Sequence, residues 1–151
     1  MKNTWIAGLF AFVVAFTAVS FAADTKIDFS KLKCLVADKA AVEDKSSDYK
    51  DCKVYFCCGN CQKKFNDDKK GFASKANHQL IASKQVEQKA CPFSGSPLKP
   101  EFSVEFKGAK VGFCCEGCKG KAEKMSDDDK LAKLFGEDAY AKAKFAKVEK
   151  K

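Results

Sequence analysis

The chain has 151 residues, of which 28 are basic and 20 acidic, so its formal net charge is +8. Every basic residue is a lysine, and lysines alternate with acids, as in Asp67-Asp68-Lys69-Lys70. Specific recognition of phosphates and base edges relies on the planar arginine fork, so the composition argues against a nucleic-acid-binding protein. We interpret the charged side chains as part of a solvated surface.

Residues 1–22 are predicted to be a signal peptide. Met1-Lys2 is a basic start, Trp5 to Val19 is apolar, and Ser20-Phe21-Ala22 offers small residues for cleavage after Ala22. The apolar run is shorter than the ~20 residues that cross a bilayer, which favours export over a retained membrane anchor. We therefore expect a periplasmic or extracellular protein with no membrane span after removal of the signal peptide.

Eight of the nine cysteines belong to a pattern that occurs twice, with the second copy 57 positions after the first. In both copies a single cysteine precedes a Cys-Cys pair by 23 positions. Nine of the 28 aligned positions are identical, which indicates a duplication. The cysteines of the pattern are Cys34, Cys57, Cys58 and Cys61 in the first copy and Cys91, Cys114, Cys115 and Cys118 in the second.

The repeat divides the mature chain into small units. We expect a lead-in over 23–33, a first cysteine module over 34–80, a linker over 81–90, a second module over 91–125 and a Lys/Ala-rich helical tail over 126–151. Units of this size bury little apolar surface and commonly need disulfides, a metal or a neighbour.

Each copy contains the pattern of a β-hairpin followed by a helix. The segment 103–114 alternates apolar and polar residues around Gly108, which predicts a hairpin with Gly108 in its turn. The segment 47–57 is the counterpart, with Asp51-Cys52 in the predicted turn. Short helices are expected after the last cysteine of each copy, so the predicted fold class is α+β.

Two further helices are predicted in the tail. Ser126, followed by three aspartates, is typical of a helix N-cap, and Leu131, Leu134 and Phe135 then line one face. A second helix is predicted over roughly 138–148. We expect the apolar faces of both helices to pack on the modules.

The cysteine segments resemble the TRASH/YHS class of small cysteine modules. The residues concerned are Val54-Tyr-Phe-Cys-Cys-Gly-Asn-Cys in the first copy, and Cys91-Pro-Phe-Ser-Gly with Val111-Gly-Phe-Cys-Cys-Glu-Gly-Cys in the second. The chain is similar to tandem, secreted versions found in planctomycete-type bacterial proteins. The resemblance covers Cys34 to about Met125. It implies two treble-clef-like, zinc-finger-like modules with a metal site, and some members are linked to heavy-metal handling, especially of copper.

The chain departs from the family pattern at a position where the family has a cysteine. The second position of its opening Cys-x-x-Cys knuckle is Ala37 in the first copy and Ser94 in the second. Three family-type ligands remain in each copy, and we hypothesise that Cys58 and Cys115 supply the missing fourth thiolate or lie beside an open position. All eight cysteines of the pattern are therefore candidate ligands for up to two ions of zinc or copper(I).

Disulfides are the alternative use of these cysteines, because an exported chain meets an oxidising compartment. A bridge from Cys34 to Cys57 or Cys61, and its equivalent in the second copy, would give a disulfide-stapled extracellular interaction module. The ninth cysteine is Cys52, which aligns with Ala109 and would remain unpaired.

Catalysis has little support in the sequence. The gaps in Cys58–Cys61 and Cys115–Cys118 suit a thiol oxidoreductase, but neither copy has room for a thioredoxin scaffold. His78, the only histidine, has no equivalent in the second copy, so packing beneath the linker helix is favoured over metal ligation. Neither a Ser/His/Asp group nor paired carboxylates can be recognised. We expect a metal-binding protein rather than an enzyme.

Overall fold

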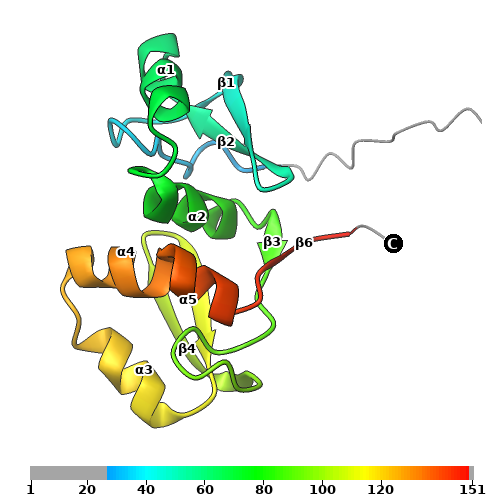
Figure 1. Ribbon diagram of the computed structural model, residues 1–151, viewed down its shortest axis with the longest axis vertical. Helices are drawn as coiled ribbons and strands as arrows, with labels where there is room; N and C mark the ends of the chain where they lie inside the picture. The colour runs from blue at the N-terminus through cyan, green and yellow to red at the C-terminus, as the bar shows by residue number, and fades with distance from the viewer. Residues whose placement is uncertain (1–26, 150–151) are drawn as a thin grey trace, which may run out of the picture.

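A computed structural model describes residues 27–149. The predicted signal peptide lies outside these residues. The fold is α+β, with two small hairpin-plus-helix modules in tandem, as predicted (Figure 1). Within 27–149, no helix is both long and apolar enough to cross a membrane.

The two copies contain the same succession of elements, except that the second copy has one additional helix. The first consists of β1 (Val42–Tyr49), β2 (Cys52–Phe56), α1 (Gly59–Asp67), α2 (Ala73–Ala82) and β3 (Val86–Glu87). The second consists of β4 (Lys99–Phe106), β5 (Ala109–Phe113), α3 (Glu116–Glu123), α4 (Asp127–Phe135), α5 (Glu137–Lys142) and β6 (Ala146–Lys147). The helices α4 and α5 thus follow α3 much as α2 follows α1.

Both hairpins are closed by two-residue turns. Lys50 and Asp51 have φ values of 49° and 59°, and Lys107 and Gly108 have φ values of 46° and 83°. Two consecutive positive φ angles define a type I′ turn, whose twist matches that of the strands. The prediction that Cys52 lies in the first turn is wrong, because Cys52 begins β2 and is buried.

Glutamine side chains cover the second strand of each hairpin. Gln79 Oε1 accepts from the Tyr55 N–H at 2.7 Å, and its Nε2 donates to the Tyr55 carbonyl at 2.8 Å. Gln88 makes the same pair of bonds to Gly112, at 2.7 and 2.9 Å. Gly112 is the counterpart of Tyr55 in the repeat. The amides satisfy backbone groups that the two-stranded sheets leave without a strand partner.

The two copies share one hydrophobic core. Helix α2 contacts β2 of its own copy and β5, α4 and α5 of the second copy. Phe56 and Phe65 of the first copy and Phe113 and Phe135 of the second are all fully buried in this core. The short strands β3 and β6 pair antiparallel and join the ends of the copies (Figure 1).

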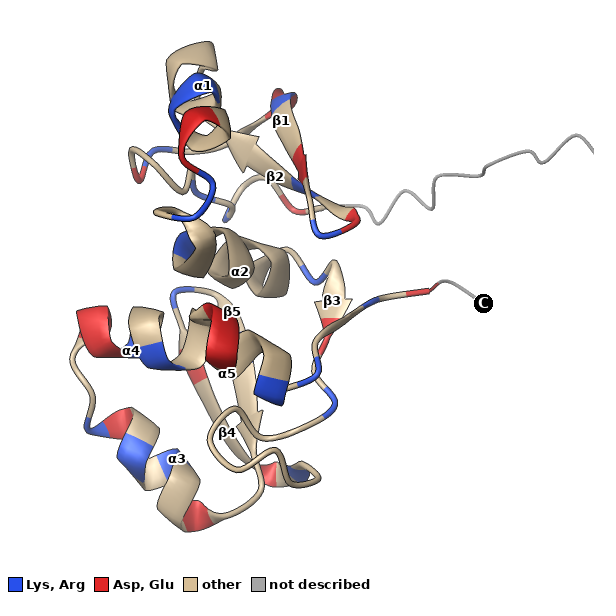
Figure 2. Ribbon diagram, in the orientation of Figure 1, with Lys and Arg blue, Asp and Glu red and all other residues tan. Residues whose placement is uncertain are grey.

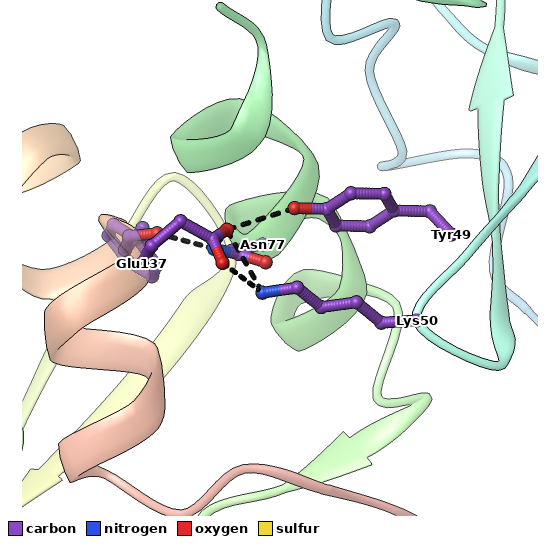
Figure 3. A network of polar contacts seen from close by, with 5 residues as sticks. Tyr49, Lys50, Asn77 and Glu137 are labelled. Atoms are coloured by element: carbon purple, nitrogen blue, oxygen red, sulfur yellow. Dashed lines mark hydrogen bonds and ion pairs between the residues drawn. The ribbon is translucent and has the colours of Figure 1, made fainter. Parts of the chain in front are cut away.

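A polar network also connects the copies (Figure 3). Glu137, the first residue of α5, accepts hydrogen bonds from the Tyr49 hydroxyl at 3.0 Å, Lys50 Nζ at 2.9 Å and Asn77 Nδ2 at 3.0 Å. Asn77 Nδ2 also donates to the Phe135 carbonyl at 2.8 Å. The tip of the first hairpin is thereby attached to the second copy.

The tail differs in part from the prediction. The Ser126 N-cap is confirmed, since its Oγ accepts from the Asp129 N–H at 3.2 Å. The helix predicted over 138–148 is wrong beyond Lys142. Lys144 has a φ of 50°, and the chain then enters β6. The cause is the pairing of β6 with β3, a long-range contact that helical spacing cannot reveal.

Lysines and acids are interleaved along most helices and hairpins rather than gathered on one element (Figure 2). Ion pairs such as Lys63–Asp67 and Lys133–Asp129 lie between exposed side chains. Such pairs contribute little to stability, in keeping with a solvated surface.

Candidate metal centres

Three thiols meet in each copy, and they come from three different parts of the module. The first cysteine lies in a turn before the hairpin, the second directly follows the hairpin, and the third lies in the first turn of the following helix. Their Sγ atoms all lie within 4.8 Å of one another. The clusters are Cys34, Cys57 and Cys61 in the first copy and Cys91, Cys114 and Cys118 in the second.

The turn that carries the first cysteine has the same shape in both copies. The Cys34 carbonyl accepts from the Asp38 N–H at 3.1 Å, and the Cys91 carbonyl accepts from the Gly95 N–H at 2.8 Å. Asp38 and Gly95 have φ values of 53° and 72°. This tight reversal brings the first cysteine back against the end of the hairpin, where the second cysteine lies.

The sulfur spacing fits metal coordination. Cys57 Sγ lies 3.7 Å from Cys61 Sγ, and Cys114 Sγ lies 3.8 Å from Cys118 Sγ. Zinc–sulfur bonds of about 2.3 Å in a tetrahedron place neighbouring sulfurs about 3.8 Å apart. All nine cysteines belong to the described residues, and all are free thiols. Each cluster is therefore close enough to bind a metal ion.

The thiols of one cluster differ in acidity. Burial raises the pKa of Cys91, but the N–H and hydroxyl of Ser94 and the N–H of Cys114 outweigh burial and lower it to about 6. Burial, with the neighbouring cysteines, raises the pKa of Cys118 to about 12. One sulfur thus ionises readily while its neighbour keeps its proton. Because thiol ligands must lose their protons, binding of a metal ion to such a cluster would depend on pH.

Cys58 and Cys115 lie beside the clusters rather than within them. They are the N-cap residues of α1 and α3 and are exposed. Cys58 Sγ lies 3.9 Å from Cys57 Sγ, and Cys115 Sγ lies 3.7 Å from Cys114 Sγ. Neither side chain makes a capping hydrogen bond. The backbone N–H of Cys61 nevertheless lowers the pKa of Cys58. Three of the four candidate ligands of each copy are thus brought together, and the fourth lies adjacent.

The copies differ at the knuckle position where the resembled family has a cysteine. Ser94 Oγ lies 3.2 Å from Cys114 Sγ. Its first-copy counterpart, Ala37, has no polar side-chain atom. From the sequence, Ser94 was noted only as the position of an expected but absent ligand, and its place three residues after Cys91 was the signal that it could lie near the cluster.

His78 and Cys52 lie outside both clusters. His78 Nε2 lies 3.0 Å from the Phe106 carbonyl, and its ring meets Phe135 edge-on with centroids 4.8 Å apart. It lines a cleft of about 510 Å³ between the copies. Cys52 is buried, with Sγ directed to the Gln85 carbonyl at 3.9 Å. His78 therefore packs between the copies, and Cys52 is a core residue.

In comparisons with known proteins, no family model, curated protein or solved structure matched the chain. The functional evidence is therefore the pair of three-thiol clusters and their surroundings.

Proposed function

We propose that this is an exported metal-binding protein of the TRASH/YHS type, with one zinc or copper(I) ion in each copy. The observation that carries the proposal is the repeated three-thiol cluster, whose sulfurs lie within 4.8 Å of one another in both copies. Thiolates are the ligands that soft and borderline metals prefer. The sulfur-only donor set supports zinc and copper(I) over the oxygen-seeking cations magnesium and calcium.

The shared core supports a metal-handling role over a purely structural one. In small independent zinc modules the metal contributes ~10–16 kcal/mol, enough to decide whether the module folds. Here α2 packs on both copies, and buried aromatic rings from both belong to one core. The fold therefore does not depend on metal alone, which allows ions to enter and leave a folded protein.

Cys58 and Cys115 complete the proposed sites as fourth thiolates. Both are exposed at a helix N-cap, with Sγ 3.9 and 3.7 Å from a cluster sulfur, which supports their joining the ligand set of a bound ion. The Cys58→Ser and Cys115→Ser variants should bind metal more weakly and with an altered absorption spectrum. Unchanged metal content, affinity and spectrum would dismiss this part of the proposal.

A second candidate function is thiol–disulfide exchange with a substrate disulfide. The Cys58 thiolate would attack one substrate sulfur and release the other as a thiolate, and Cys61 would then release the reduced substrate by forming a Cys58–Cys61 disulfide. The observation that favours it is the pairing of an exposed thiol of lowered pKa with a buried thiol whose pKa burial and neighbouring cysteines raise to about 12. The metal-binding function requires no catalysis. An insulin-reduction assay separates the two, because a metal-binding protein without exchange activity leaves insulin intact.

Metal analysis combined with thiol counting tests the main proposal, on protein isolated from its own compartment. We expect about two zinc or copper ions per chain and no disulfides among the cluster cysteines. Metal-free protein with oxidised cysteines would overturn the proposal and favour the disulfide-stapled module.

A further inference from the structure

We propose that the two metal sites are unequal, because the Ser94 hydroxyl makes the second-copy site hold its ion more tightly than the first-copy site. The inference rests on the proposed metal-binding function and assigns different rates of metal release to the two copies. The second-copy site would retain its ion, and the first-copy site would exchange.

The hydroxyl of Ser94 is oriented by a second hydrogen bond. The Ser96 N–H donates to Ser94 Oγ at 3.2 Å, which leaves the hydroxyl hydrogen for another partner. Cys114 Sγ lies 3.2 Å from this hydroxyl, which also contacts Cys91 of the same cluster. A metal-bound Cys114 thiolate carries no proton, so the hydroxyl must be the donor and the sulfur the acceptor.

The first copy has the same turn without the hydroxyl. Ala37 replaces Ser94, while Asp38 and Gly95 both have the left-handed conformation that shapes the turn. Among the described residues, the side-chain hydrogen-bond partners of Cys57 Sγ are the sulfurs of other cysteines. The turns have the same backbone shape but different residues, and among these differences Ser94 is the one that places a hydroxyl beside a cluster sulfur.

A hydrogen bond to a metal-bound thiolate withdraws part of its negative charge. The sulfur is then less reactive toward electrophiles, and its orientation toward the metal is fixed. Partners of this kind, one shell beyond the ligands, typically change metal affinity 10–100-fold. Ser94 is thus a positioning residue for the second-copy site.

Release of zinc from the loaded protein tests the inference copy by copy. Zinc-loaded full-length mature protein is mixed with excess EDTA, and freed thiols are labelled with iodoacetamide over time. Peptide mass spectrometry then measures the labelling of Cys57 and of Cys114 separately. In the wild type we expect Cys57 to be labelled first. Ser94→Ala should speed labelling of Cys114 about tenfold and leave Cys57 unchanged.

Two further variants keep the test independent of folding effects. Ser94→Thr retains a hydroxyl and should preserve slow release from the second copy. The matched variant Ala37→Ser should slow release from the first copy. Equal rates of Cys114 labelling in the wild type and in Ser94→Ala would overturn the inference while leaving the metal-binding function intact. Failure of either copy to bind zinc would overturn the proposed function as well.

Discussion

The Lys50 ammonium group lies 2.9 Å from both carboxylate oxygens of Glu137 and so joins the hairpin of the first copy to α5 of the second. The equivalent lysine, Lys107, is paired instead with Asp127 of its own copy, at 3.3 Å. The duplicated lysine thus serves two different contacts, one between the copies and one within a copy. The two copies are therefore not equivalent in their contacts, although the lysine is identical in both.

Replacing Glu137 by glutamine should weaken the contact between the copies. The Glu137 side chain is 57% exposed, so solvent screening limits the expected loss in free energy of unfolding at pH 7 to about 1 kcal/mol. Urea unfolding of the wild type and Glu137→Gln measures this loss.

The pH dependence of that loss has a definite sign. Burial raises the pKa of Glu137, but Lys50, Asn77 and Tyr49 outweigh it and hold the pKa below its ordinary 4.5. The stabilisation is therefore complete above pH 4.5 and disappears as the pH falls through the folded-state pKa. A wild-type advantage that stays constant down to acid pH would contradict this assignment.

We predict that Gln79 contributes more to the free energy of unfolding than a polar side chain usually does. It makes two hydrogen bonds to the Tyr55 backbone and a third to the Lys33 carbonyl at 2.7 Å. Gln79→Leu removes all three in a buried setting and should lower the free energy of unfolding by about 3 kcal/mol. Gln62→Leu would be a poor comparison, since Gln62 is half-buried and also bonds the Ser46 carbonyl. Lys63→Leu on the exposed face of α1 is the better control and should cost little.

Cys52→Ala should leave the metal content unchanged. The second copy has a fully buried alanine, Ala109, at this position, and Cys52 lies outside the cluster. We expect a loss of about 1 kcal/mol from the lost packing of one sulfur atom. Metal analysis of Cys52→Ala beside Cys57→Ala checks the claim, since only the second variant should lose an ion. Loss of metal from Cys52→Ala would show that this thiol is a ligand.

In metal-free protein, Cys58 should react with iodoacetamide faster than Cys61. Cys58 is exposed, and the nearby Cys61 amide lowers its pKa, whereas burial first, and then the neighbouring thiols, raise the pKa of Cys61 to about 12. Because the thiolate is the nucleophile, the difference should be greatest near neutral pH and shrink as the pH rises. Peptide mapping after brief alkylation at several pH values measures it, and equal rates at pH 7 would contradict the assignment.

The local features of the fold could be predicted from the sequence. Alternating residues around a turn predicted both hairpins, and Ser126 before three aspartates predicted the cap of α4. The cluster cysteines were recognisable because a duplication preserved their spacing. The hairpin and cap signals are each contained in a short stretch of chain, and the cysteine spacing was recognisable because it occurs twice.

The features that were missed depend on contacts between distant segments. Nothing in the sequence near Gln79 or Gln88 shows that their amides bind strand backbones. The pairing of β6 with β3 ends the last helix six residues earlier than helical spacing indicated. The contact between the Ser94 hydroxyl and Cys114 Sγ likewise became visible only in the structure.

Cobalt(II) titration of the reduced, metal-free protein tests the central claim most directly, because thiolate-to-cobalt absorption reports both stoichiometry and ligand type. We predict saturation at two cobalt ions per chain, with Cys57→Ser and Cys114→Ser each binding one ion through full thiolate ligation. A wild-type chain that shows no thiolate-to-cobalt absorption, or a Cys57→Ser Cys114→Ser double variant that still shows two sites, would contradict the account.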